Sequence, residues 1–187
     1  MSAEDWLPPS EGWMTALEMQ RLETLASWGG HILEVGVWKG RSTSALTHGP
    51  GHVHCVDPFS GNTGEWWGAQ GDTERRFREN MARLGRTNYT LYRMTSDEFF
   101  GQVDKTAQYR TIVIDGLHSS PQVYKDLTNA WPHLAPGGWM FVDDVWRGTV
   151  RQDLRTFRSA HPEARFVPNL RKGGWLYKSG FLVKPQG

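Results

Sequence analysis

The fold is decided by the stretch His31-Ile-Leu-Glu-Val-Gly-Val-Trp-Lys-Gly-Arg-Ser42. Its first residues form a short apolar run, which is typical of a strand buried in a sheet. Glycines follow at positions 36 and 40, where they let the backbone turn sharply and approach a ligand closely. Ser42 lies at the start of the helical segment that comes next. The order strand, glycine turn and helix predicts an α/β domain that begins with a ligand-binding loop.

Short apolar runs recur along the chain and alternate with helical segments, as in a parallel sheet covered by helices. We expect strands over residues 31–35, 52–56, 90–94, 110–114, 139–142, 166–167 and 175–183, with turns at 136–138 and 173–174. The fold class is therefore α/β, with a doubly wound, mostly parallel sheet and an antiparallel C-terminal strand.

Capping and stop residues delimit the expected helices. Ser10 should begin an entry helix that Gly29-Gly30 ends, and its apolar stripe should be buried (Trp13, Leu17, Leu22 and Leu25). Asp72 and Ser96 should cap two further helices. The last two helices are expected from Ser120-Pro121 to about residue 131 and over residues 149–159.

The chain has 187 residues, which is the size of one domain. We assign residues 1–187 to a single domain with an entry helix over 10–30, a core over 31–145, and a C-terminal helix and strands over 146–187. The single cysteine, Cys55, fits a packed strand residue in a reducing cytoplasm. A net charge of +1, no signal-peptide pattern and no long apolar stretch predict a cytoplasmic protein. Its expected partner is a small molecule, not nucleic acid or a membrane; a homo-oligomer stays open.

Acidic residues follow four of the expected strands or end them: Glu34, Asp57, Asp115 and the pair Asp143-Asp144. In a doubly wound sheet, ligands bind outside the carboxyl ends of the strands. We therefore expect these acids to converge on one crevice.

The cofactor loop lacks the G-x-G-x-x-G pattern of dinucleotide-binding proteins, which disfavours a nicotinamide enzyme. A carboxylate at Glu34 would repel a pyrophosphate and suits a cationic ligand. Asp57 has the spacing of an acid that binds ribose hydroxyls. Ser96 and Asp97 follow the third strand, where they can reach an adenine edge. Together these positions favour a nucleoside ligand.

The pattern Glu34-x-Gly36-x-x-x-Gly40-x-Ser42 resembles the cofactor loop of the cation-dependent O-methyltransferases, of the catechol and caffeoyl-CoA type. Residues 12–42 and Asp57-Pro58-Phe59 resemble the macrocin-type sugar O-methyltransferases, and the resemblance extends to about residue 145. It implies the Rossmann-like class I methyltransferase fold and S-adenosyl-L-methionine (SAM) as the methyl donor.

The same resemblance implies roles for the residues of the cofactor loop and strand ends. Glu34 would contact the methionine amino group and Ser42 its carboxylate. The remaining cofactor contacts would come from Gly36, Val37, Asp57, Pro58, Ser96, Asp97 and Asp115. Trp38 stands where many methyltransferases have a glycine, as a bulky residue does in the cation-dependent group.

Asp115, Asp143 and Asp144 would repel one another unless they were protonated, exposed to solvent or neutralised by a cation. Oxygen ligands without a Cys/His cluster suit Mg²⁺, or Mn²⁺ or Ca²⁺ in its place, and not zinc. In the macrocin-type enzymes an Asp-x-x-His step and a paired acid form the metal site. By this resemblance Asp115, Asp143 and Asp144 hold the metal and His118 is the general base.

The predicted function is metal-dependent O-methylation of a small molecule: a sugar, a catechol or a natural-product phenol. The alternatives are a metal-independent N- or C-methyltransferase and a SAM-binding protein without catalysis. A hydroxylase-like relative is disfavoured because no 2-His-1-carboxylate pattern is present. The substrate walls are expected from loops that carry aromatic residues: Trp66 and Trp67, Leu117 to Pro121, Trp146-Arg147 and Asn169 to Trp175.

Overall fold

The computed structural model describes residues 6–60, 72–169 and 178–187. The strands of these residues form one seven-stranded sheet in the order β3-β2-β1-β4-β5-β7-β6. Their bounds are β1 His31–Val35, β2 His52–Val56, β3 Tyr89–Tyr92, β4 Tyr109–Ile114, β5 Leu134–Val142, β6 Arg165–Pro168 and β7 Gly180–Val183. Of these strands, β7 runs antiparallel to both neighbours, β5 and β6. The predicted mostly parallel sheet with an antiparallel C-terminal strand is confirmed.

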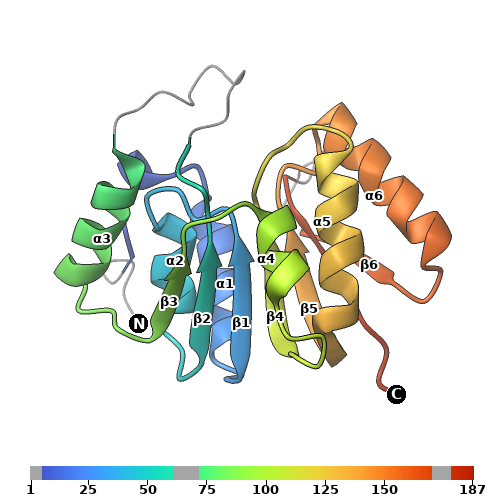
Figure 1. Cartoon of the computed structure of the whole chain (residues 1–187), viewed down its shortest axis with the longest axis horizontal. Helices are drawn as coiled ribbons and strands as arrows, with labels where there is room; N and C mark the ends of the chain where they lie inside the picture. The colour runs from blue at the N-terminus through green and yellow to red at the C-terminus, as the bar shows by residue number, and fades with distance from the viewer. Residues whose placement is uncertain (1–5, 61–71, 170–177) are drawn as a thin grey trace.

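Helices cover both faces of the sheet, as Figure 1 shows with α1 and α2 behind β1 and β2 and with α4 and α5 in front. Their bounds are α1 Ala16–Ala26, α2 Arg41–Leu46, α3 Thr73–Arg83, α4 Ser96–Gln102, α5 Gln122–Ala130 and α6 Gly148–Ala160. Two short 3₁₀ helices, η2 Pro9–Glu11 and η3 Trp131–His133, precede α1 and follow α5. Among the described helices, none combines the length and apolar character needed to cross a membrane.

The core consists of two apolar clusters, one on each face of the sheet. Alternate strand residues point to opposite faces, so the strand side chains are shared between the two clusters. The front cluster joins Leu33 and Ile112 to α4, α5 and α6. The rear cluster joins Ile32, Val113 and the fully buried Cys55 to α1, α2 and α3. Burial on both faces explains why the strands read as apolar runs without alternation.

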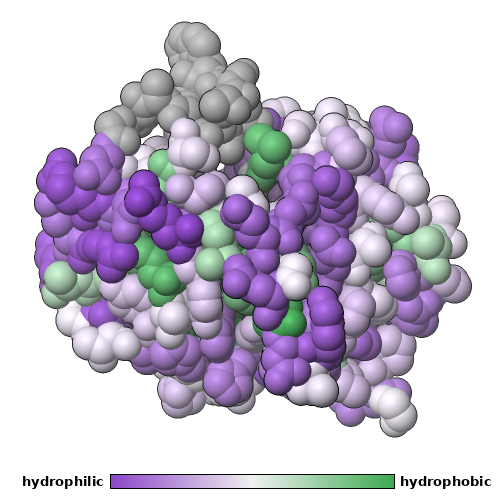
Figure 2. All heavy atoms as spheres, in the orientation of Figure 1, coloured by the Kyte–Doolittle hydropathy of each residue, from purple (hydrophilic) through white to green (hydrophobic). Residues whose placement is uncertain are grey.

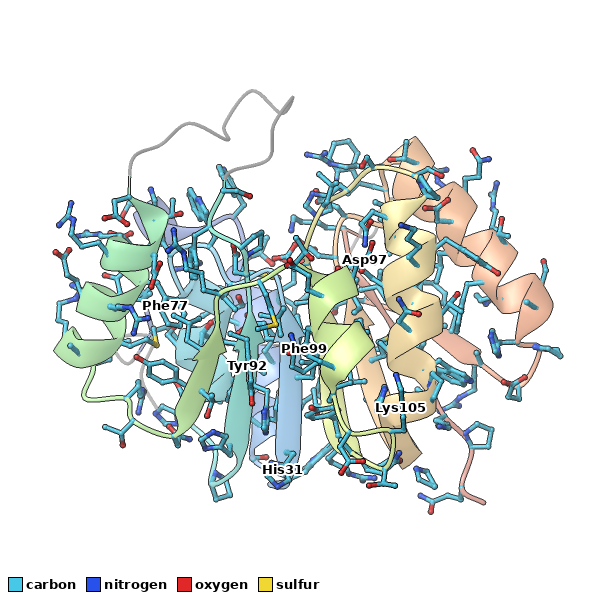
Figure 3. All side chains as sticks on the ribbon, viewed as in Figure 1. His31, Phe77, Tyr92, Asp97, Phe99 and Lys105 are labelled. Carbon is cyan, nitrogen blue, oxygen red and sulfur yellow. The ribbon has the colours of Figure 1, made fainter. Side chains whose placement is uncertain are left out.

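The parallel strands all end at the same edge of the sheet. In Figure 3, Asp97 lies at this carboxyl edge, after β3, whereas His31 lies at the opposite edge, at the start of β1. Cofactor and substrate sites of doubly wound sheets lie at the carboxyl edge, so the fold places the predicted site residues there.

The entry helix begins later than the sequence predicts. Residues 9–11 form a 3₁₀ turn, and α1 starts only after Thr15, whose side chain forms a capping box with Glu18. The box satisfies helix N–H groups that Ser10 would have left to the chain upstream. Trp13 consequently precedes the helix and is 58% exposed, so its predicted place in the buried stripe is wrong.

Two further boundaries differ from the prediction. Thr95, not Ser96, caps α4, because Thr95 and Glu98 form a second capping box. Strand β5 starts at Leu134, before the predicted turn at 136–138, and its pairing with β4 is irregular between Tyr109 and Thr111. This irregularity accommodates Pro136, which has no N–H to donate to a neighbouring strand.

The outer face of α3 is hydrophilic, as the purple patch over this helix in Figure 2 shows. Arg75 pairs with Glu79 at 2.5 Å and Arg78 pairs with Glu74 at 2.8 Å, both one helical turn apart. The basic residues of this helix are thus balanced by acids on the same face.

Three histidines gather on β1 and β2 near the edge opposite the carboxyl ends. His31 Nδ1 lies 3.1 Å from His54 Nε2, and His54 Nδ1 lies 3.1 Å from the Tyr92 hydroxyl. The ring of His52 is 5.3 Å from that of His54. Burial lowers the pKa of His54 to about 4, and the neighbouring His52 and His31 add to this effect.

We expect the protein to lose stability as the pH falls from 6.5 towards about 4. In this window His54 of the unfolded chain takes up a proton, whereas His54 of the folded chain stays neutral, so the free energy of unfolding falls with the pH. A full shift of this size corresponds to about 3 kcal/mol, and because His54 is only half-buried we expect about 1 kcal/mol. Urea unfolding of the wild type and of His54→Gln across this window measures the effect. An equal loss in both proteins would contradict the assignment to His54.

Candidate functional site

A cavity of about 560 Å³ lies at the carboxyl edge of the sheet. This volume falls within the range of small-molecule sites, about 300–1,000 Å³. The predicted site residues that line it are Gly36, Val37, Ser42, Asp57, Pro58, Ser96, Asp97, Asp115, His118, Asp143 and Asp144. Strands β1, β2, β4 and β5 and the loops after them bring these residues together from distant parts of the chain.

The loop after β1 approaches the loop after β4 so closely that only glycine fits at position 36. Gly36 has a φ of 86°, and a Cβ built there would lie 2.2 Å from the carbonyl oxygen of Asp115. A left-handed φ and this close approach each exclude a larger side chain. The loop therefore presents bare backbone to the cavity, as a bound ligand would require.

Asp57 fixes the shape of this loop. Its Oδ2 accepts hydrogen bonds from the backbone N–H groups of Val37 at 3.0 Å and Trp38 at 2.9 Å, and its Oδ1 accepts one from Phe59 at 2.7 Å. These bonds hold Trp38 in a left-handed conformation, with a φ of 44°. Each carboxylate oxygen has a second acceptor site, so the predicted ribose contact stays a prediction.

Glu34 lies behind the cavity wall and does not line it. The side chain is fully buried and faces α2, where the Thr43 hydroxyl donates to its Oε2 at 2.6 Å. Burial raises the pKa of Glu34 to about 8, although hydrogen bonds from Ser42 and Thr43 lower it. The structure thus does not support the predicted direct contact with a methionine amino group. Strand alternation turns Glu34 inward, where it anchors the helix that carries Ser42.

Ser96 and Asp97 lie beside two polar residues of α5 that the sequence did not single out. Ser96 Oγ donates to Asp126 Oδ1 at 2.6 Å, and Gln122 Nε2 donates to Asp97 Oδ1 at 3.2 Å. Asp126 is buried, and burial raises its pKa to about 6. Because Thr95 caps the helix, the Ser96 hydroxyl is left to form this polar wall. Asp97 itself is exposed and pairs with Lys125 at 3.0 Å.

Asp143 and Asp144, at the end of β5, meet a lysine that the sequence analysis missed. Lys178 Nζ forms an ion pair with Asp143 Oδ2 and lies 3.7 Å from Asp144 Oδ1 and 3.8 Å from Glu18 Oε2. Burial lowers the pKa of Lys178, but the surrounding carboxylates raise it above its ordinary value, which keeps the ammonium charged.

The topology explains why Lys178 reaches the acids. Because β7 is antiparallel to β5, it starts at the edge where β5 ends, and Gly180 pairs with Val142. Lys178 precedes β7 and its carbonyl accepts a hydrogen bond from Val145 N–H at 2.8 Å. Its position directly before the expected antiparallel strand was the available signal.

Arg147 and Trp146 complete the surroundings of Asp144. Arg147 Nε lies 2.8 Å from Asp144 Oδ2, and Trp146 Nε1 donates to Asp144 Oδ1 at 2.9 Å. Both residues line the cavity, as predicted for the substrate wall.

His118 bridges the ends of β4 and β5. Its Nε2 lies 3.3 Å from Asp115 Oδ1 and 3.7 Å from Asp144 Oδ2. Burial lowers the pKa of His118, but the hydrogen bond to Asp115 and the charges of Asp115 and Asp144 outweigh it and raise the pKa above its ordinary value. Nδ1 is buried and has no hydrogen-bond partner among the described residues.

The carboxylates of this site do not fit a metal ion as they are arranged. Both oxygens of Asp144 and one of Asp143 face N–H donors of the chain itself, from Trp146, Arg147 and Lys178. In residues 6–60, 72–169 and 178–187, no group of three or more His, Cys, Asp or Glu side chains has the geometry of a metal site. The repulsion among the acids is relieved here by cationic side chains.

Aromatic and apolar side chains form part of the cavity wall. Trp13 stacks on Trp38 with ring centroids 4.4 Å apart. Leu117 is 37% exposed and Trp146 49% exposed, and all four residues line the cavity. Of the other predicted walls, residues 119–121 and Asn169 do not line it. Trp66, Trp67 and residues 170–175 lie outside the described part of the chain.

Solved structures similar to this chain share its fold. The O-methyltransferase TomG from Streptomyces achromogenes, involved in tomaymycin synthesis and solved with SAM, is 18% identical, with a TM-score of 0.72 over 96% of this chain and 83% of that one. An O-methyltransferase from Bacillus cereus, solved with SAH, is 20% identical, with a TM-score of 0.70 over 94% and 84%. An rRNA methylase from Streptococcus thermophilus is 12% identical, with a TM-score of 0.66 over 94% and 99%.

At these identities the structural matches establish the Rossmann-like methyltransferase fold and leave the acceptor open. A comparison with curated proteins found no significant match. The sequence itself matches a family model described as a methyltransferase domain over residues 33–145, more than half of the chain. The matched segment runs from β1 to the residue after Asp144 and contains most of the cavity wall. The chain therefore belongs to the methyltransferase-domain family.

Proposed function

We propose that this protein transfers a methyl group from SAM to a hydroxyl group of a small molecule. The observation that carries the proposal is the pair His118 and Asp115 at the wall of a cavity with a glycine-backbone loop. A histidine oriented by a carboxylate is suited to remove a proton from a hydroxyl group.

The residues of the cavity fit SAM, which supplies an electrophilic methyl group on a sulfonium when bound. The Gly36 loop offers bare backbone, and Ser42 at the start of α2 offers a hydroxyl for a carboxylate. Ser96, Asp97 and Gln122 offer polar groups for a base edge. The O-methyltransferases from Streptomyces achromogenes and Bacillus cereus were solved with SAM and SAH, which supports the same class of ligand here.

His118 would act as the general base. When its Nε2 carries the hydrogen that faces Asp115, the lone pair is on Nδ1, the nitrogen without a partner among the described residues. Asp115 holds the ring in this orientation and stabilises the imidazolium that forms. His118 thus receives the proton of the acceptor hydroxyl as the oxygen attacks the methyl carbon. Alignment of the oxygen with the methyl carbon supplies a further part of the acceleration.

No step of this mechanism is assigned to the predicted Mg²⁺, because the carboxylates face N–H donors of the chain. Lys178 and Arg147 favour the metal-independent form among the alternatives. Transfer to nitrogen or carbon and SAM binding without catalysis give different outcomes in the experiments below.

The exposed aromatic side chains at the cavity favour an acceptor with a flat or apolar face. Trp38, stacked on Trp13, lies at the cofactor loop, whereas Trp146 and Leu117 lie beside Asp144 and His118. Large aromatic surfaces with a polar edge bind such ligands well. A phenolic acceptor would meet both the aromatic wall and the base.

Asp97→Ala should weaken SAM binding by about tenfold or less without loss of folding, since Asp97 is exposed and lost hydrogen bonds to charged groups are worth about 1.5–3 kcal/mol at most. Isothermal titration calorimetry with SAM measures the effect. Lys125→Ala is the matched control, because it removes the ion pair with Asp97 but does not line the cavity. Equal losses in both variants would show that Asp97 acts through the ion pair and not on the ligand.

His118→Ala should lower kcat by about 100-fold or more and leave SAM affinity unchanged, because general base catalysis contributes about that factor. The assay follows transfer of a labelled methyl group to a panel of hydroxylated acceptors. His31→Ala is the control, since His31 lies at the opposite edge of the sheet (Figure 3). An unchanged rate would remove His118 as the base. Methylation of amines alone would replace the hydroxyl acceptor.

Trp146→Ala should raise the KM for the acceptor by about tenfold and change kcat little, since an aromatic wall binds ground state and transition state alike. Steady-state kinetics with the best acceptor of the panel give both constants. Trp28→Ala is the control: Trp28 is 45% exposed but does not line the cavity. A KM equal to that of the control would exclude Trp146 from the acceptor site.

A further inference from the structure

We propose that Lys178 is a fixed internal cation that holds Asp143 and Asp144 and excludes a divalent metal from the site. Methyl transfer by this protein then needs no metal ion. This inference rests on the proposed function for its catalytic part, but its binding part can be tested without any acceptor.

Lys178 lies at the meeting point of three carboxylates from different elements. Asp143 and Asp144 follow β5, and Glu18 comes from the first turn of α1; all three lie within 4 Å of Nζ. Asp143 and Glu18 are 5% and 2% exposed, so solvent screens these charges little. An ammonium group with three donors suits such a cluster.

The backbone and neighbours of Lys178 fix it in this place. Its carbonyl accepts the hydrogen bond from Val145 N–H, directly after the two acids. The next residue, Ser179, is fully buried and donates from Oγ to Glu18 Oε1 at 2.7 Å, and Asn169 Nδ2 donates to Ser179 Oγ at 3.1 Å. Glu18 is itself held by the capping box of α1. Lys178 is therefore part of a built polar network and not a surface side chain folded inward.

The same network opposes a divalent ion electrostatically and by competition for oxygen atoms. Arg147 approaches Asp144 from the other side, so two permanent cations already balance the paired acids. A metal bound between Asp143 and Asp144 would lie next to the Lys178 ammonium, which costs free energy because like charges repel at this distance. It would also have to displace the N–H donors that now face these oxygens.

Lys178 lines the cavity on the same side as His118, since both residues contact Asp144. We assign it the role of a positioning residue: it keeps Asp144 between His118 and Arg147, and so keeps the base in place. Its charge also makes the site more favourable for the oxygen anion that develops as His118 takes up the proton.

The test combines metal binding with turnover. Mn²⁺ binding is measured by electron paramagnetic resonance on the wild type, Lys178→Met and the conservative variant Lys178→Arg, without SAM or acceptor. We expect no bound Mn²⁺ in the wild type or Lys178→Arg at millimolar Mn²⁺, and bound Mn²⁺ in Lys178→Met, because the carboxylates have lost their counter-charge. Lys105→Met, in which the altered residue lies away from the carboxyl edge (Figure 3), should behave as the wild type.

Turnover in EDTA and in Mg²⁺ completes the test. The wild type and Lys178→Arg should turn over equally in both, whereas Lys178→Met should lose about tenfold or more in EDTA and regain part of it with Mg²⁺. Wild-type protein that binds Mn²⁺, and loses the ion in Asp143→Asn, would overturn the proposal even if Lys178→Met fails to fold. If no hydroxyl acceptor is methylated, the proposed function fails, while the Mn²⁺ measurement still decides the role of Lys178.

Discussion

Carboxylates that meet at one edge of a sheet require a counter-charge, and this requirement shapes the whole site. Asp115, Asp143 and Asp144 stand at the ends of adjacent strands because β4 and β5 are parallel and in register. Lys178 and Arg147 neutralise the pair after β5, and His118 links it to Asp115. The antiparallel direction of β7 is what delivers Lys178, so the C-terminal strand is part of the site as well as of the sheet.

The N-terminal helix is coupled to the same constraint. Glu18 serves two purposes: it closes the capping box that starts α1, and it accepts the hydrogen bond from Ser179 beside Lys178. A residue that ends one helix turn thus also sets the charge next to the acids. On the other side of the cavity, Asp57 shapes the Gly36 loop by accepting three backbone hydrogen bonds. The two halves of the cavity are therefore each organised by one carboxylate with structural partners.

Periodicity and glycine placement predicted the fold well because strands buried on both faces are apolar throughout and end at recognisable turns. The acids after these strands were placed correctly, since parallel topology brings their ends together. The prediction failed where contacts between distant segments decide. Glu34 is turned behind the wall by strand alternation, Thr95 and not Ser96 caps α4, and Trp13 precedes its helix. Lys178 was missed because its partners come from α1 and β5, which no local pattern connects.

The account depends most directly on what lies between Asp115, Asp143 and Asp144 when the cavity is filled. A crystal structure of the protein with SAH and MnCl₂, with anomalous data for manganese, answers this. We predict SAH along the Gly36 loop, the Lys178 ammonium beside Asp143, and no anomalous peak among the three aspartates. A manganese peak at these carboxylates, with Lys178 displaced from Asp143, would contradict the account.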